Sequence, residues 1–428
     1  MVIIILAFSF IGLVICGLPI SFAMGISSLI ALIYHSDLPF NLIVHRTMMG
    51  VDHFVLLSIP LFIFAGTIME QGGISERLVK FAYTLLGRFR GGLPMVVVGS
   101  TMLQSGISGS TVADVSAMSA MTLKPLEKEG YARPYSLSVI GASCAFAILI
   151  PPCILMVVVA AVANTSVVAV FAAGLLPATV IGAMMLLFIY VHARIANMPA
   201  GQKFSLFEIS KGFKDALLAL GVPILIFGGI RAGVATVTEM AAFAVLYALL
   251  VGGLVYRRLS WKMIYDSLIE TCVATGVITM LMGFAMIFGY LLATEGVPAA
   301  VANWMREYEI SALGVQIITA LIFVFIGAVL EGAPAVLIFV PILLPVVREL
   351  GIDVVHWLTV VVLASGIGLF VPPTGLAVLV ACSVGRVRME QMIKPLMPFL
   401  LLLLVGLGII IAFPLLSTLL PRVMELPY

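Results

Sequence analysis

Residues 150–153 read Ile-Pro-Pro-Cys, and residues 371–374 read Val-Pro-Pro-Thr. Each proline pair interrupts a long apolar run. Proline lacks a backbone N–H and clashes with the preceding helical turn, so each pair is expected to break a helix. Carbonyl groups freed at such a break are available to bind a cation. The two breaks therefore predict two unwound helices of related function.

The surrounding composition is that of a membrane protein. Of 428 residues, 10% are charged and 63% are hydrophobic, whereas a soluble domain has about 25% charged residues. Continuous apolar runs, each long enough for a bilayer that needs about 20 helical residues, cover residues 2–34, 134–163, 167–193 and 393–417. The sequence predicts an all-α polytopic membrane protein, with residues 2–34 forming either one tilted helix or two shorter ones. This first run lacks a basic leader and a cleavage site, so we expect it to be retained.

Charge, cysteine and histidine exclude several other classes. A net charge of +2 offers no basic surface for nucleic acid. The histidines show no spacing typical of a metal site, and the cysteines are scattered singly, as expected for buried structural thiols. These cysteines are Cys16, Cys144, Cys153, Cys272 and Cys382. We expect no protein-bound metal or cofactor other than a coupling ion.

Basic residues between the apolar runs predict the topology. They cluster in residues 77–90, 124–133, 194–214, 257–262 and 386–394, and the positive-inside rule places these loops in the cytoplasm. The intervening turns are poor in basic residues and lie on the other side. The loops alternate between the two sides of the membrane only if residues 93–123 enter and leave the membrane on the same face, and residues 311–347 do likewise. Each segment is therefore predicted to be a re-entrant hairpin, the first on the cytoplasmic side and the second on the opposite side.

A shift of 221 residues (372 − 151) aligns the chain with itself. It places Gly106 on Gly327 and superposes three prolines, whereas chance predicts about 0.5 such coincidences for this composition. Both copies contain a hairpin tip, a Pro-Pro break and a closing span, in that order. The loop charges place the beginnings of the two copies on opposite faces of the membrane. The sequence therefore predicts an inverted-topology repeat, as in many secondary transporters.

The hairpin tips and breaks supply the candidate site. Small and polar residues in non-helical backbone at membrane depth are tolerated inside protein or against a water-filled cavity. Uncharged oxygens there suit Na⁺. The predicted sodium ligands are Ser105, Ser108, Ser110, Pro151, Asn164, Gly327, Glu331, Gly332, Val371 and Thr374. The predicted substrate ligands are Ser108, Ser110, Asp114, Ser166 and Thr374. Close helix packing, kinks without ions, and Asp114 as a cap of hairpin backbone are the structural alternatives.

These features divide the chain into five predicted segments. Residues 1–92 hold scaffold helices and an interfacial arm helix, since residues 74–89 mix basic and apolar faces. Residues 93–166 and 311–385 are the two halves of a transport domain. Residues 167–310 are further scaffold helices and connectors, and residues 386–428 hold the C-terminal span.

Four motifs together resemble a known family. They are Gly17-Leu18-Pro19-Ile20, the hairpin stretch Gly106 to Asp114, Gly229-Ile230-Arg231-Ala232-Gly233 with Thr236 to Glu239, and Val371-Pro372-Pro373-Thr374-Gly375. In this order they resemble the large membrane subunit, DctM or SiaM type, of tripartite ATP-independent periplasmic (TRAP) transporters. The resemblance spans nearly the whole chain.

The resemblance implies an elevator-type, Na⁺-driven importer of organic acids such as sialic acid or C4-dicarboxylates, in a bacterial inner membrane. It also implies a small four-helix membrane subunit as a separate chain and a periplasmic substrate-binding protein. Ser108, Ser110 and Asp114 carry over as candidates for ion and substrate binding. The protein is then not an enzyme.

Two other functions remain as alternatives. The first is a channel or a proton-coupled transporter of the same architecture, and a proton route would need Asp114 or Glu331 as its titratable residue. An intramembrane serine hydrolase is suggested by Gly106-Ile107-Ser108-Gly109, but it needs a histidine base at membrane depth. The candidate histidines, His192 and His356, both fall at predicted span ends.

Overall fold

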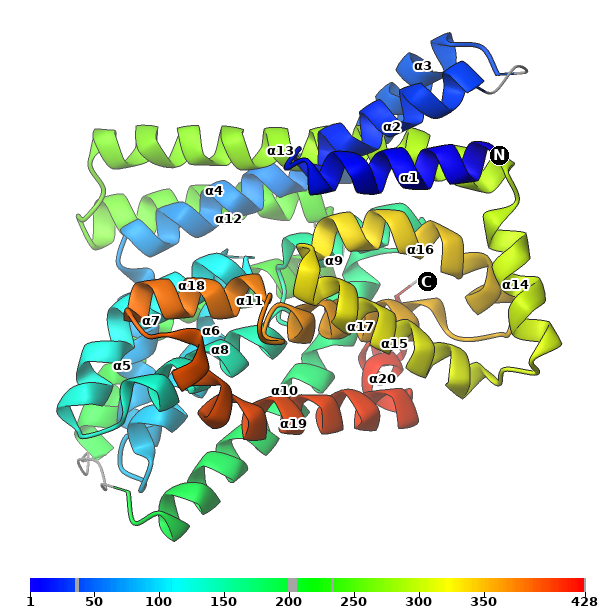
Figure 1. Cartoon of the computed structure of the whole chain (residues 1–428). Coiled ribbons are helices and arrows are strands. Elements are labelled where there is room, and N and C mark those ends of the chain that lie inside the picture. Colours follow the sequence, from blue (N-terminus) through cyan, green and yellow to red (C-terminus); the bar gives the residue numbers. More distant parts are fainter. Residues whose placement is uncertain (35–37, 109, 199–205, 232–234, 427–428) are drawn as a thin grey trace.

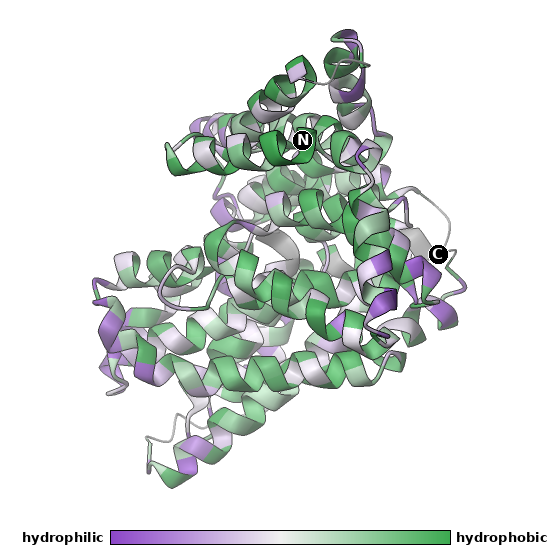
Figure 2. Ribbon diagram, turned by 45° about the vertical axis from the view of Figure 1, so that its right-hand side comes forward, coloured by the Kyte–Doolittle hydropathy of each residue, from purple (hydrophilic) through white to green (hydrophobic). Residues whose placement is uncertain are grey.

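The computed structural model describes residues 1–34, 38–108, 110–198, 206–231 and 235–426. Within these ranges every regular element is helical, and no strand occurs among the described residues. The predicted all-α fold is confirmed. Seven helices in the described ranges are long and apolar enough to cross a membrane. Figure 2 shows hydrophobic residues along the lengths of most helices, with hydrophilic residues gathered toward the edges of the molecule.

The two repeats occupy corresponding helices. The first comprises α4 (Ser58–Gln71), α5 (Ile74–Leu86), α6 (Gly92–Ser108), α7 (Thr111–Lys128), α8 (Arg133–Ala147), α9 (Ile154–Ala163) and α10 (Val167–Ile195). The second comprises α13 (Trp261–Thr294), α14 (Val297–Glu307), α15 (Ala312–Val329), α16 (Gly332–Glu349), α17 (Val354–Gly368), α18 (Leu376–Gly385) and α19 (Met389–Ala412). A shift of 221 residues carries the bounds of α7 and α8 onto those of α16 and α17, so the repeat holds at the level of whole helices.

The remaining elements flank these repeats. They are α1 (Val2–Ile15), α2 (Ile20–Tyr34), α3 (Asn41–Val51), the 3-10 helix η1 (Phe54–Leu57), α11 (Leu206–Arg231), α12 (Val237–Leu249), the π-helical turn η2 (Leu250–Val255) and α20 (Leu415–Val423). The run 2–34 is thus two helices. They separate at Gly17, which adopts a φ of 85° that favours glycine.

Both predicted hairpins and both predicted breaks are present. The first hairpin is α6 and α7, and the second is α15 and α16. Each proline pair lies in a non-helical gap, between α8 and α9 in the first repeat and between α17 and α18 in the second. Local proline chemistry is sufficient to explain these gaps.

The repeats pack against each other reciprocally. Helix α7 of the first repeat contacts α18 of the second, and α16 of the second contacts α9 of the first. Helices α8 and α17 also touch. Such an exchange of equivalent partners is what a pseudo-two-fold relation between the halves produces. We call α6–α9 and α15–α18 together the inner body.

A second group of helices covers one side of the inner body. Helix α13 contacts α2, α3 and α4, and α12 contacts α4 and α11. In Figure 1 the helices α1, α2, α4, α12 and α13 lie together along the top, and α10, α19 and α20 lie along the bottom. We call α1–α4 and α11–α13 the outer layer. The division of the chain into scaffold and transport domain remains a prediction.

The predicted interfacial segment 74–89 forms α5, which turns Ile74, Leu78 and Ala82 inward. It is fastened to the turn before α13 by the pair Arg258–Glu76, whose Nη1 and Oε2 are 2.8 Å apart. The Arg77 guanidinium also lies 3.4 Å from the ring centroid of Tyr256. Helix α5 is therefore joined to the outer layer at the turn before α13, on the side of the molecule where the basic loops lie.

Candidate functional site

A cavity of about 480 Å³ lies where the two hairpin tips meet the outer layer. The first tip contributes Ser110 to Ala113, and the second contributes Glu331 to Pro334. The breaks add Ile148, Ile154, Leu155 and Leu369, and the outer layer adds residues of α4, α13 and the α1–α2 turn. Residues from distant parts of the chain thus enclose a space of the size that small-molecule sites have.

Four helices begin at this cavity. The first residues of α2, in the outer layer, and of α7, α9 and α16, in the inner body, are all among its lining. A helix N-terminus presents unpaired backbone N–H groups and the positive end of the helix dipole, which together attract anions. Lysine, arginine and histidine are absent from the described lining. An anionic group in this cavity would therefore be held by main-chain N–H groups and hydroxyl side chains.

Behind the first tip, a polar cluster links the hairpin to the broken helix. Ser105 is 3% exposed, and its hydroxyl donates to the carbonyl oxygen of Ala147, the last residue of α8, at 2.9 Å. Asp114 lies in the first turn of α7 and is 1% exposed. A buried carboxylate is costly unless charge or hydrogen bonds compensate it. This cluster therefore places a buried carboxyl group and a buried hydroxyl beside the cavity.

Sequence reasoning missed one member of this region. Gln104 is 1% exposed, and its Oε1 atom has no hydrogen-bond partner. Buried side-chain oxygens are normally satisfied, so this oxygen suits a ligand such as a cation or water. An amide side chain in a helix whose other polar residues are only serines and a threonine was the signal that could have identified it.

The second tip has a different chemistry. Glu331 is the N-cap residue of α16 and lines the cavity, as does Gly332. Behind it, an added Cβ at Gly327 would stand 2.8 Å from the carbonyl oxygen of Ser365, so glycine permits the close approach of α15 to α17. The positions equivalent to Gln104, Ser105 and Asp114 are Phe325, Ile326 and Ala335. The two hairpins are related in fold and unequal in polarity.

The structure brings only some predicted ligands to the cavity. Ser110, Glu331 and Gly332 line it. Ser105, Asp114 and Gly327 lie directly behind the tips, and Pro151 is buried in its break. Ser108 ends α6, and its side chain lies outside the described residues, as does Gly109.

Four predicted ligands lie elsewhere. Asn164 is the C-cap of α9 and Ser166 the N-cap of α10. They stand at the opposite end of α9, about 15 Å from the cavity for a ten-residue helix. Thr374 is exposed in the second break, and the carbonyl of Val371 accepts a hydrogen bond from the N–H of Gly375 at 2.9 Å. None of the four is part of the cavity lining.

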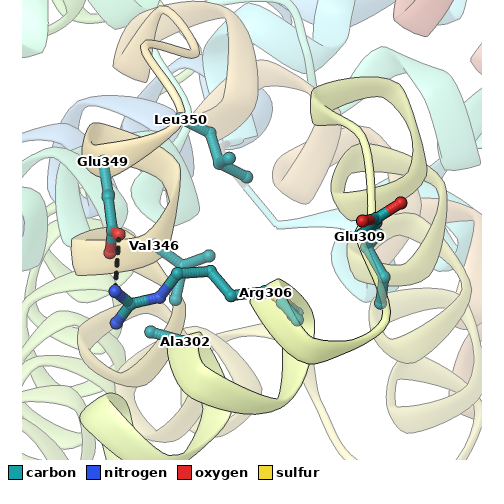
Figure 3. A pocket seen from close by; sticks show the side chains of 8 residues that line it. Ala302, Arg306, Glu309, Val346, Glu349 and Leu350 are labelled. Carbon is teal, nitrogen blue, oxygen red and sulfur yellow. Dashed lines mark ion pairs between the residues drawn. The ribbon is translucent and has the colours of Figure 1, made fainter.

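A smaller cavity, of about 220 Å³, lies between α14 and the end of α16. Figure 3 shows Arg306 reaching toward Glu349, and their Nη1 and Oε1 atoms are 3.5 Å apart. Both side chains are about half exposed. A solvent-exposed pair of this kind contributes little to stability, and this cavity contains no residue of the hairpin tips.

The remaining single residues follow or correct the sequence expectations. Cys144, Cys153 and Cys382 are buried, but Cys16 and Cys272 are exposed, so the prediction of buried thiols was wrong for these two. His356 is buried, and its two ring nitrogens contact Ser417 at 2.6 Å and Gln316 at 2.8 Å. It lies near the start of α17, whereas Ser365 and Leu369, at the other end, line the cavity. Its engaged nitrogens and distant position do not suit a general base for a serine in the first hairpin.

Comparisons with known proteins agree with this architecture. Residues 7–416 match the family described as "Tripartite ATP-independent periplasmic transporter, DctM component". The chain is 31% identical to the sialic acid TRAP transporter large permease protein SiaM of Vibrio cholerae, over 97% of each chain. It is 32% identical to the C4-dicarboxylate TRAP transporter large permease protein DctM of Pseudomonas aeruginosa, over 94% of each.

A solved structure shares the fold. The YdaH transporter of Alcanivorax borkumensis superposes with a TM-score of 0.65 over 90% of this chain and 89% of its own, at 15% identity. This likeness concerns the fold alone. The family match covers nearly all of the chain, and so do the matches to these two relatives. The chain belongs to the DctM, or large permease, family of TRAP transporters.

Proposed function

We propose that this large permease imports an organic acid by Na⁺-coupled, elevator-type transport. The observation that carries the proposal is the cavity at which α7, α9 and α16 all begin. These helix N-termini, together with that of α2, offer N–H groups to a carboxylate without a basic side chain in the described lining. The relatives named for sialic acid and C4-dicarboxylates handle organic acids, which are ligands of this kind.

Coupling to Na⁺ is supported by the polar atoms around the tips. Gln104, Ser105 and Asp114 place buried oxygens beside the first tip. Glu331 and the main chain at Gly332 place others at the second. Hard cations prefer such oxygen ligands. A cation here would also offset the carboxylates that line the cavity, so ion and anion would favour each other's binding.

An elevator movement is supported by the distinction between the inner body and the outer layer, which meet where α13 packs on α16 and α4 packs on α6. Both hairpins and both breaks belong to the inner body, and they pack on each other across the two repeats. The cavity lies at the boundary with α4 and α13. We infer that the inner body moves as a unit against this outer layer, carrying the site across the bilayer of a bacterial inner membrane.

The family implies two partners for this activity. One relative is the isethionate TRAP transporter permease protein DctMQ of Oleidesulfovibrio alaskensis, and this chain matches 61% of its length. We propose that a small membrane subunit, as a separate chain, and a periplasmic substrate-binding protein complete the transporter.

The test is uptake into proteoliposomes that contain the chain with its small subunit and a loaded binding protein. Labelled succinate and labelled sialic acid serve as probes. We expect uptake of at least one probe that depends on an inward Na⁺ gradient. Uptake driven by a proton gradient without Na⁺ would replace this proposal with the proton-coupled alternative.

A matched pair of variants then tests the site. Ser110→Ala removes the hydroxyl that caps α7 at the cavity, where it accepts from the N–H of Ala113 at 3.5 Å. We expect weaker Na⁺-dependent uptake with normal membrane insertion. Thr179→Ala, on α10 and outside the cavity, is the control and should transport normally. Equal uptake by both variants would remove Ser110 from the site.

A further inference from the structure

The two walls of the cavity differ in electrostatic character. The inner body presents the N-termini of α7, α9 and α16, which favour an anion, and one carboxylate, that of Glu331. The outer layer presents one helix N-terminus, that of α2, and two carboxylates, Glu70 on α4 and Glu270 on α13. Both glutamate side chains are exposed where they line the space. An organic anion bound at the hairpin tips would thus face two negative charges across the cavity.

These two glutamates lie at a similar depth in the outer layer, near one face of the membrane. Glu70 is the second-last residue of α4, which is followed by α5 and its basic residues. Glu270 lies ten residues into α13, after the turn that contains Arg257 and Arg258. The contacts Arg258–Glu76 and Arg77–Tyr256 hold α5 to that turn. Both carboxylates therefore lie near the membrane face that the basic loops mark as cytoplasmic.

The inner body carries the anion-binding N-termini, whereas the two glutamates stay with the outer layer. In an elevator-type transporter the hairpin tips face different residues of the outer layer as the site moves from one side of the membrane to the other. The tips stand beside Glu70 and Glu270 in this structure, which is the arrangement near the cytoplasmic face. The repulsion between substrate and glutamates is therefore specific to this position.

We propose that Glu70 and Glu270 are specificity-determining residues that weaken binding of the organic anion on the cytoplasmic side and so promote its release. This inference rests on the proposed import of an organic acid. Coulomb repulsion across a cavity of this size, partly screened by water, changes an affinity by about threefold to tenfold. The same carboxylates attract Na⁺ while they repel the anion.

The experiment uses the same proteoliposomes, with labelled succinate and labelled sialic acid as probes. External half-saturation is measured from initial uptake rates. Internal affinity is measured as the concentration of unlabelled probe, trapped inside the vesicles, that halves uptake of the labelled probe. Glu70→Gln, Glu270→Gln and the double variant are compared with the unaltered chain. Glu270→Asp keeps the charge, and Glu307→Gln neutralises an exposed glutamate on α14, outside the cavity.

We expect each Gln variant to lower the inhibitory internal concentration about threefold or more, and the double variant to lower it further. External half-saturation should stay within about twofold, and Glu270→Asp and Glu307→Gln should match the unaltered chain. An unchanged inhibitory internal concentration in the double variant would overturn this inference but not the proposed function. An equal change in the internal inhibitory concentration and the external half-saturation concentration would do the same. Absence of uptake of both probes by the unaltered chain overturns the proposed function, and this inference with it.

Discussion

Arg348 donates from Nη2 to the carbonyl oxygen of Ala163 at 3.1 Å, which joins the end of α16 in the second repeat to the end of α9 in the first. A mirrored contact joins the repeats in the other direction. Arg133 Nη1 donates to the carbonyl oxygen of Gly385, the last residue of α18, at 3.1 Å. Each short helix that follows a Pro-Pro break thus has its C-terminus capped by an arginine of the other repeat, where a cation favours the helix dipole.

The first prediction concerns this capping. Arg348→Gln should lower the free energy of unfolding by about 1–3 kcal/mol, because a partly buried carbonyl loses a charged donor. Thermal unfolding of the purified chain in detergent measures the change. Arg306→Gln is the control, since Arg306 belongs to an exposed pair at 3.5 Å, and it should change little. Equal melting temperatures for the two variants would show that the contact contributes nothing.

The second prediction concerns the approach of α15 to α17. Gly327→Ala should destabilise the protein by about 1–3 kcal/mol, since the new methyl would stand 2.8 Å from the Ser365 carbonyl oxygen and push the second tip away from its break. Thermal unfolding and uptake should fall together. Gly276→Ala, on α13 with nothing within 4 Å of the added methyl, should be neutral. A Gly327→Ala protein as active and stable as the control would contradict this packing.

The third prediction concerns the buried carboxylate. Asp114→Asn keeps the shape of the side chain and removes its charge, so the Na⁺ concentration for half-maximal uptake should rise about tenfold or more. Uptake measured against Na⁺ concentration gives this value. Asp52→Asn, at the exposed end of α3, should leave it unchanged. An unaltered Na⁺ requirement in Asp114→Asn would exclude that carboxylate from ion binding.

The fourth prediction concerns pH. The hydrogen bond from Arg133, with Nη2 and Oε2 3.0 Å apart, lowers the pKa of the Glu127 carboxyl. The folded state therefore binds this proton less readily than the unfolded state does. Its stabilising contribution is present at neutral pH and is lost as the pH falls below the ordinary glutamate pKa of about 4.3.

Melting temperatures of the unaltered chain and of Glu127→Gln, measured between neutral and acidic pH, test this sign. The difference between them should be constant near neutrality and vanish in acid. Glu307→Gln should show no such pH-dependent difference, because Glu307 is exposed and takes part in no ion pair among the described residues. A difference that grows in acid would contradict the assigned pairing.

The sequence by itself determined the helical breaks, the hairpins and the repeat. These depend on local chemistry: a Pro-Pro pair cannot continue a helix wherever it lies, and runs of small and polar residues interrupt apolar segments. The 221-residue shift also follows from the order of such landmarks. For this reason the bounds of α7 and α8 reappear in α16 and α17.

Only the tertiary structure decided which of these residues share a cavity. Asn164 and Ser166 follow the first break closely in sequence, yet the intervening helix α9 carries them to its far end. Glu70 and Glu270 are 200 residues apart and line one space. Their proximity depends on how α4 and α13 pack against two interlocked repeats. Such packing joins residues distant in the chain, and no local periodicity or spacing encodes it.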